Sequence, residues 1–131
     1  MISASDNGIV HLVSVGSVEA TLERLLSMLQ AKGITVFAVV DHSGEAAKVG
    51  LEMRPTRLVI FGSPKAGTPV MIAAPDSALD LPLKILIAEG PDGRTAVSYN
   101  SVAFLRERYG LTPELAAKLA AIEQIAAAIV H

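Results

Sequence analysis

Apolar side chains follow three distinct patterns along the N-terminal third of the chain. The segment Ile9–Val15 is rich in aliphatic and β-branched residues and predicts a strand. Leucines at helical spacing then predict a helix between Ser17, a typical N-cap residue, and Gly33, a typical helix stop. The β-branched segment Ile34–Val40 is nearly all apolar and predicts a strand buried on both faces. Strand, helix and strand in this order predict a βαβ unit with two parallel strands.

Shorter elements follow in the middle of the chain. A short helix is predicted over Glu45–Lys48 and a strand over Arg57–Phe61. Two more strands, Leu83–Glu89 and Arg94–Tyr99, flank the segment Gly90–Gly93, whose residues are typical of a hairpin turn. The sheet therefore combines a parallel pair with an antiparallel pair.

The C-terminal part of the chain predicts two helices. Asn100 or Ser101 caps the first, which extends through Arg108. Thr112 followed by Pro113 opens the second, because proline fits the first position of a helix. The apolar stripe of this last helix consists of Leu115, Leu119, Ile122, Ile125 and Ile129.

The elements together predict an α/β (α+β) fold in a single compact domain over residues 1–131. We expect a mixed sheet of about five strands that begins with a βαβ unit, ends in a hairpin and packs against helices. Residues 1–8 are small and polar, and are predicted to be frayed.

Composition argues against several classes of protein. The chain has no cysteine, which excludes disulfides, thiolate metal sites and cysteine nucleophiles. The net charge is −2 and aromatic residues make up 4%, so the basic patches and stacking rings that bind nucleic acid are not expected. The N-terminus lacks the basic and apolar regions of a secretory signal, and we expect a cytoplasmic protein.

The chain is nevertheless apolar, with a mean hydropathy of +0.48. Its longest strictly apolar run, Ile125–Val130, is far shorter than the ~20 residues that span a bilayer, and no membrane association is expected. The surplus of apolar residues instead predicts a subunit interface, and hence a homodimer.

The connection from Phe61 to Lys84 carries the densest set of turn signals and charges in the sequence. Connections of this length are uncommon inside compact domains and are often functional. Gly62 and Gly67 have the spacing of a phosphate-binding loop, but Thr68-Pro69 replaces the lysine that such a loop requires. The structural alternative is that Thr68 caps a short helix beginning at Pro69, while the glycines permit bends.

Charged residues near the predicted strand ends are the candidates for chemistry. Asp41 and His42 directly follow a strand, at the end where open α/β sheets bind ligands. Asp80 lies among leucines and requires a cation or hydrogen bonds, for which Lys65 and Lys84 are the candidates. Each residue also has a structural alternative, as a hydrogen-bonded histidine, a helix cap or a paired carboxylate.

Four motifs are specific enough to compare with known families. They are Asp41-His42 with Ala46-Ala47 and Gly50, the segment Phe61–Met71, the segment Ala78–Lys84, and Val97-Ser98-Tyr99-Asn100. They resemble the domain of unknown function 302 family, from about Ile9 to Arg108. Ser63 departs from the asparagine usual in that family, so a hydroxyl replaces a side-chain amide in the turn. The resemblance implies a compact α/β fold, often a homodimer, without an established activity.

Three functions follow from these observations. The preferred one is a domain that binds a polar or anionic small molecule, with no metal and no cofactor. The second is an enzyme with His42 as general base and Lys65 or Asp80 in support. The third is a structural or homodimeric interaction domain without a ligand. The candidate ligand-binding residues are Asp41, His42, Lys65, Thr68, Asp80 and Lys84.

Overall fold

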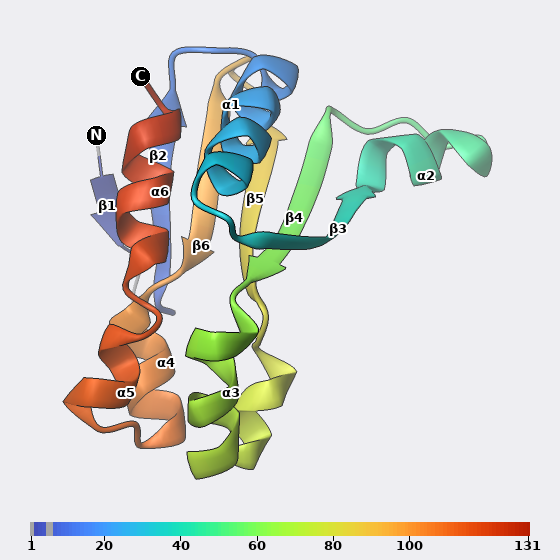
Figure 1. Cartoon of the computed structure of the whole chain (residues 1–131). Coiled ribbons are helices and arrows are strands. Elements are labelled where there is room, and N and C mark those ends of the chain that lie inside the picture. The colour runs from blue at the N-terminus through green and yellow to red at the C-terminus, as the bar shows by residue number, and fades with distance from the viewer. Residues whose placement is uncertain (1, 5–6) are drawn as a thin grey trace.

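The computed structural model describes residues 2–4 and 7–131. In this part of the chain, six strands form one sheet in the order β1-β2-β6-β5-β4-β3 (Figure 1). The strands are β1 (Ile2–Ala4), β2 (Ile9–Ser14), β3 (Thr35–Asp41), β4 (Thr56–Gly62), β5 (Leu83–Glu89) and β6 (Thr95–Asn100). β1 pairs with β2 inside the stretch that was expected to be frayed. Met1, Ser5 and Asp6 of that stretch lie outside the described residues.

The α/β (α+β) fold and its hairpin are confirmed, but the expected mixed sheet is wrong. Every neighbouring pair among the described strands is antiparallel. β2 and β3 run in the same direction, yet β6, β5 and β4 lie between them. The helix α1 (Val18–Ala31) therefore carries the chain across three strands. The order of elements along the sequence predicted this crossover but not how many strands it passes.

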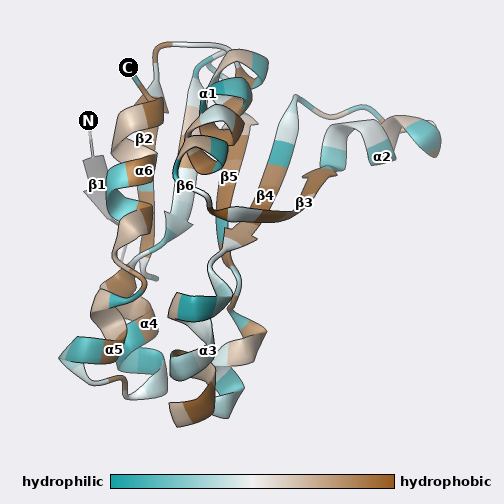
Figure 2. Cartoon of the chain, viewed as in Figure 1, coloured by the Kyte–Doolittle hydropathy of each residue, from teal (hydrophilic) through white to brown (hydrophobic). Residues whose placement is uncertain are grey.

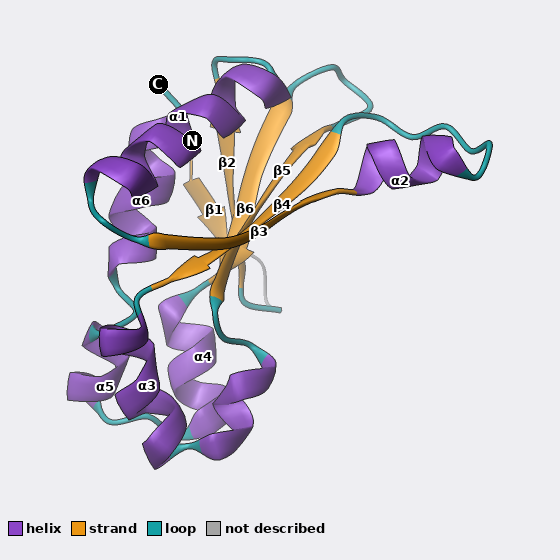
Figure 3. Ribbon diagram, turned by 45° about the vertical axis from the view of Figure 1, so that its right-hand side comes forward, coloured by secondary structure: helices purple, strands orange, loops and turns teal. Residues whose placement is uncertain are grey.

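The helices form two groups around the sheet (Figure 3). α1 and α6 (Ala121–Ile129) lie on one face, and α2 (His42–Lys48) extends from the end of β3. Beyond one end of the sheet lie α3 (Pro64–Ala73), the 3₁₀ helix η1 (Pro75–Leu79), α4 (Val102–Tyr109) and α5 (Pro113–Ala117). The single last helix expected from Thr112 onward is thus two helices, with a turn between α5 and α6.

The expected last helix is interrupted because its apolar side chains pack in two different hydrophobic clusters. Ile122, Ile125 and Ile129 of α6 are buried with α1 and the sheet in the main core. Leu119, which lies in the turn before α6, instead packs with residues of α3, α4 and the segment before β5. One straight helix would present all four side chains along one line, so the turn allows each group to reach its own cluster.

The segment Ile34–Val40 is not buried on both faces as the sequence predicted. It forms β3, which is an edge strand with one neighbour. Val36, Phe37 and Val39 are 37%, 51% and 41% exposed. Figure 2 shows hydrophobic colouring on β3 as on much of its neighbours β4 and β5. An apolar run indicates that a strand is covered from water. It does not indicate whether the surface that covers the strand belongs to the same chain.

The sheet face opposite α1 and α6 is also apolar. Strand pairing places Leu58, Ile60, Leu86, Ala88 and Ala96 together on this face, which we call the open sheet face. These residues are only half-buried although β4, β5 and β6 are interior strands. In Figure 3, α1 and α6 lie on the other face of the sheet. Antiparallel sheets that face water usually carry polar residues on that face, whereas here Lys84 and Ser98 share it with an aliphatic patch.

The main core should dominate stability. Leu25 of α1 is fully buried, whereas Leu79 of η1 is 77% exposed. We expect Leu25→Ala to lower the free energy of unfolding by about 2–5 kcal/mol, because it leaves a cavity in packed surroundings. Leu79→Ala should change it by less than about 0.5 kcal/mol. Urea denaturation of both variants tests this, and equal losses would contradict the assignment of the core.

Candidate functional site

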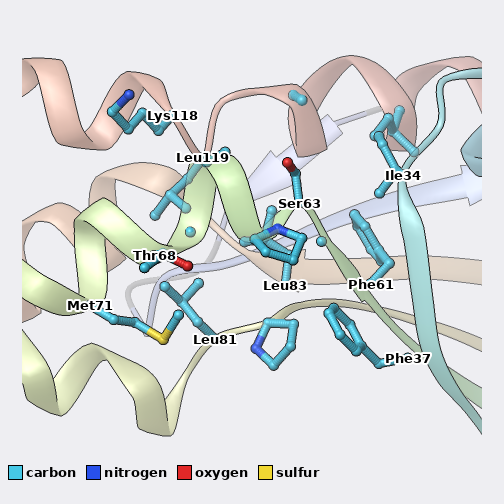
Figure 4. A pocket seen from close by; sticks show the side chains of 17 residues that line it. Ile34, Phe37, Phe61, Ser63, Thr68, Met71, Leu81, Leu83, Lys118 and Leu119 are labelled. Atoms are coloured by element: carbon cyan, nitrogen blue, oxygen red, sulfur yellow. The ribbon is translucent and has the colours of Figure 1, made fainter.

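An apolar pocket of about 200 Å³ lies where the sheet meets the helices at its lower end (Figure 4). Four parts of the chain enclose it: the start of β3, the end of β4 with the first turns of α3, the segment before β5, and the junction of α5 and α6. The lining residues are Ile34, Phe37, Phe61–Pro64, Ala66–Thr68, Met71, Leu81–Leu83, Lys118, Leu119, Ala121 and Ile125.

The start of α3 shapes one wall of this pocket. Ser63 is the N-cap residue, with extended backbone angles, and Pro64 takes the first helical position. Thr68 therefore does not cap a helix, and Pro69 lies inside α3, which corrects the expected boundary. The sequence contains two proline start signals in succession, Ser63-Pro64 and Thr68-Pro69, and the earlier one opens the helix.

The backbone conformation of this segment does not require its two glycines for bends. Neither Gly62 nor Gly67 has a positive φ, and Gly67 lies in the middle of a helix. A Cβ atom at Gly67 would meet only the Cε atom of Met71, at 3.9 Å, which is an ordinary contact. Glycine costs about 1 kcal/mol relative to alanine at such a helical position. Its effect here is to leave the pocket wider.

Three polar side chains lie on the pocket wall or at its margin. The hydroxyl of Ser63 makes no capping hydrogen bond to α3, although it occupies the N-cap position. Thr68 points its hydroxyl among the apolar side chains, and Lys118 lies at the margin beside Leu119 (Figure 4). Within the described residues, no Asp or Glu lines the pocket. The site is therefore apolar inside, with hydroxyls and one positive charge around it.

The structure does not bring the six predicted site residues together. Thr68 lines the pocket, whereas Lys65 is exposed on α3 and does not line it. Asp41 lies opposite Arg57 at the start of β4, and Lys65 follows the end of that strand. The intervening length of β4 is about 17 Å at roughly 3.4 Å per residue. His42, which follows Asp41, is exposed at the distant end.

Asp41 is a helix cap with an ionic partner. Its carboxylate accepts hydrogen bonds from the Gly44 N–H and the Ser43 hydroxyl, both at 2.8 Å, and so caps α2. Arg57 pairs with Asp41 through its Nε atom at 3.0 Å and with Glu19 through its Nη2 atom at 2.5 Å. The hydrogen bond from Gly44, then that from Ser43, lowers the pKa of Asp41, and Arg57 adds to the effect.

Asp80 has different partners from the expected lysines. Its carboxylate accepts a hydrogen bond from the Tyr109 hydroxyl and lies 3.4 Å from the Nη1 atom of Arg108. The Arg108 guanidinium also lies over the Tyr109 ring, 5.5 Å from its centroid. Lys84 instead donates to the backbone carbonyls of Asp80, at 3.3 Å, and Pro82, at 2.9 Å. This cluster of Asp80, Lys84, Arg108 and Tyr109 joins the segment before β5 to α4.

The sequence analysis did not identify the residues that complete the pocket and the Asp80 cluster. Arg108 and Tyr109 lie in a helix far along the chain, and no local pattern marks them as partners of Asp80. Phe37 and Lys118 reach the pocket from segments that the sequence assigned to a buried strand and a continuous helix. Gly67 could have been a signal only with the helix start placed at Pro64, because a glycine inside a helical segment needs a packing or functional reason.

The geometry does not assemble the enzyme that was considered. His42 lies at one end of β4, and Lys65 and Asp80 lie toward the other, so no acid–base pair forms between them.

Within the described chain, no group of three or more His, Asp or Glu residues could hold a metal ion. No helix there is both long enough and apolar enough to cross a membrane.

A helix-covered antiparallel sheet with an apolar pocket at one end defines a small α/β domain, and comparison with known proteins identifies its family. The chain belongs to the family described as "Domain of unknown function DUF302", which matches residues 10–129. The crystal structure of an uncharacterized conserved DUF302 protein from Bacillus stearothermophilus has the same fold. Its TM-score is 0.77 at 20% identity, over 94% of this chain and 95% of that chain. The family has no assigned function.

Curated relatives carry a different name. Proteins named "Fluoride-specific ion channel FluC 1" from Brucella suis and Brucella abortus are each 38% identical to this chain over 120 residues. The match covers 90% of this chain, but only 47% and 44% of the two relatives. The chain therefore spans less than half the length of these proteins.

The Asp80 cluster makes a prediction about alkaline pH. The hydrogen bond to Asp80 raises the pKa of Tyr109 above its ordinary value of 10.0, and burial adds to this effect. The neutral phenol thus stabilises the folded state below pH 10, and this stabilisation is lost as the pH rises through the folded pKa. Tyr109→Phe should lower stability at neutral pH but flatten the decline above pH 10.

Denaturant unfolding from pH 8 to 11 measures both effects. The chain has two tyrosines, so tyrosinate absorbance of the Tyr109→Phe variant reports Tyr99 alone. Burial raises the pKa of Tyr99 as well. Burial lowers the pKa of Lys84, which adds stability as the pH rises toward 10.5, but this contribution is common to the parent and the variant. Parallel alkaline declines in the two proteins would refute the role given to the Tyr109 hydrogen bond.

Proposed function

We propose that this chain is a small-molecule-binding domain whose ligand places an apolar body in the pocket beside α3. The observation that carries the proposal is a cavity of about 200 Å³ with an apolar lining and a few polar groups around it. Ligand sites commonly combine these two features, since apolar surface gives affinity and a few polar groups give orientation.

This proposal changes the kind of ligand that the sequence suggested. A purely polar ligand would lose its hydration against walls such as Phe37, Phe61 and Leu83, with few hydrogen bonds in return. An apolar ring or chain would gain affinity from leaving water there. The polar part of the ligand would lie toward Ser63, Thr68 and Lys118, so the preference for a polar group survives only at the margin.

Fluoride conduction is not proposed. The chain matches less than half of the relatives that carry the channel name, and that name can refer to their remaining part. The cytoplasmic location remains part of our proposal, and its support is a sequence without cysteine.

Titration with benzene tests the pocket itself. Benzene should shift the methyl NMR resonances of Met71, Leu83 and Ile125, which line the cavity, because a ring of this size fits a cavity of ~150 Å³ or more. The methyls of Leu86 on the open sheet face are the internal control and should not move with them. Absence of shifts at the pocket, or equal shifts on both surfaces, would overturn the proposed site.

We also propose that the protein is a homodimer that buries the open sheet face against a second copy. The face is apolar and half-exposed in one chain, and large exposed apolar patches commonly mark subunit interfaces. Lys84 and His11 lie on the same face of the sheet, so the proposed dimer requires their polar ends to reach water or acceptors around the aliphatic patch.

A matched pair of variants tests the dimer. Leu86 lies in the middle of the open sheet face, while Leu51 is 65% exposed in the connection before β4. We expect light scattering to give twice the chain mass of 13.7 kDa for the parent and for Leu51→Lys. Leu86→Lys should give a monomer, since each interface would then bury two unpaired ammonium groups. A monomeric parent, or a dimeric Leu86→Lys that retains the parental mass at low concentration, would refute this interface.

A further inference from the structure

We propose that the ligand is a small amphipathic carboxylate, with its ring or alkyl chain beside Gly67 and its carboxylate at Lys118. This inference rests on the proposed function of the pocket and specifies the class of molecule that it takes. It has two parts, the charge at the margin and the size of the cavity, and different residues determine each.

The charge part depends on Lys118. It is exposed at the C-terminal end of α5, where it contributes to the pocket, and it has no ion-pair partner among the described residues. Because no carboxylate of the described chain lines the pocket, the nearest formal charge to a bound ligand is positive. A carboxylate would be attracted there, whereas an ammonium would be repelled and would find no acceptor carboxylate.

The backbone of α3 is not the source of this preference. Pro64 has no N–H group, Lys65 does not line the pocket, and the N–H groups of Ala66 and Gly67 already donate to the Ser63 carbonyl, at 3.0 and 2.8 Å. The hydroxyls of Ser63 and Thr68 remain as neutral donors at the wall. Selection for an anion over a neutral molecule of the same shape therefore falls to Lys118.

The size part depends on Gly67. A cavity of 200 Å³ exceeds the ~150 Å³ in which a benzene ring binds, so it suits a ring or a chain of roughly six to eight carbons. Gly67 has ordinary helical geometry, and only Met71 lies within 4 Å of the position its Cβ would take. A side chain at this position would extend into free space along the wall and reduce the volume available to the ligand.

Octanoate and octan-1-ol separate the two parts, because they share a chain and differ in charge. The dissociation constants of both are measured by NMR titration with the parent, Lys118→Gln, Gly67→Ala and Gly67→Leu. Lys48→Gln is the matched control, since Lys48 is an exposed lysine on α2, away from the pocket. Thermal unfolding confirms folding, and Gly67→Ala should unfold at a higher temperature because alanine favours the helix.

We expect the parent to bind octanoate more tightly than octan-1-ol. Lys118→Gln should weaken octanoate about two- to fivefold, as an exposed ion pair would, and leave octan-1-ol and the Lys48→Gln control unchanged. Gly67→Leu should weaken both molecules by about tenfold or more, with a smaller loss for Gly67→Ala.

The failures of the two proposals are distinguishable. If both molecules bind equally and Lys118→Gln changes neither, while Gly67→Leu weakens both, the pocket stands and the carboxylate class is wrong. If neither molecule binds, or if Gly67→Leu leaves both affinities unchanged in a folded protein, the pocket is not the site and the proposed function fails with it.

Discussion

The burial of one face of the sheet under α1 and α6 is the interaction on which the rest of the structure depends. Leu25 and Leu29 of α1 and Ile125 of α6 are almost completely removed from water against Val59 and Ile85 of the sheet. Burial of apolar surface stabilises by ~25 cal/mol per Å², and this interface contains most of the fully buried side chains of the described residues. Two helices cover one face, however, and residues 2–4 and 7–131 provide no helix layer for the other.

Because one face of the sheet is covered and the other is not, the apolar pattern of the sequence predicted the strands and helices better than it predicted which of their residues are buried. The strand at Ile34–Val40, the hairpin around Gly90–Gly93 and the helix after Ser17 follow from local periodicity and turn chemistry, and all are present. The position of β3 at an edge depends on how far the crossover through α1 reaches, which is a property of the whole sheet. Local sequence does not contain that information.

The candidate site was less predictable for a related physical reason. The connection from Phe61 to Lys84, which the sequence marks as the candidate region, supplies more than half of the pocket lining. Its charged residues are the candidates because buried charges need partners. In the structure, however, these charges either pair with other groups of the protein or face water. Asp80 binds Tyr109 and Arg108, and the part of the connection that lines the pocket consists of residues without charge. Absence of a side chain, as at Gly67, is a weaker sequence signal than a charge.

The composition of α3 is difficult to explain by stability alone. Gly67 and Pro69 are both unfavourable inside a helix, and Pro69 cannot donate a hydrogen bond to the carbonyl four residues earlier. A helix that only covered the second cluster would gain from alanine or leucine at these positions. Natural proteins often break such local rules at functional sites, and the residues that break them here lie in the helix that forms the pocket wall.

Phe37 connects the two unusual surfaces of this protein. Its ring contributes to the pocket beside Phe61, yet it is 51% exposed and belongs to the edge strand β3 (Figure 4). The irregular register between Val36 and Ala38 places it outside the regular pairing with β4. In the proposed complex, this ring would contact the ligand from one side, and its exposed part would contact any partner that covered the edge of the sheet. Ligand binding and coverage of the edge would therefore act on the same ring, so each would alter the free energy of the other.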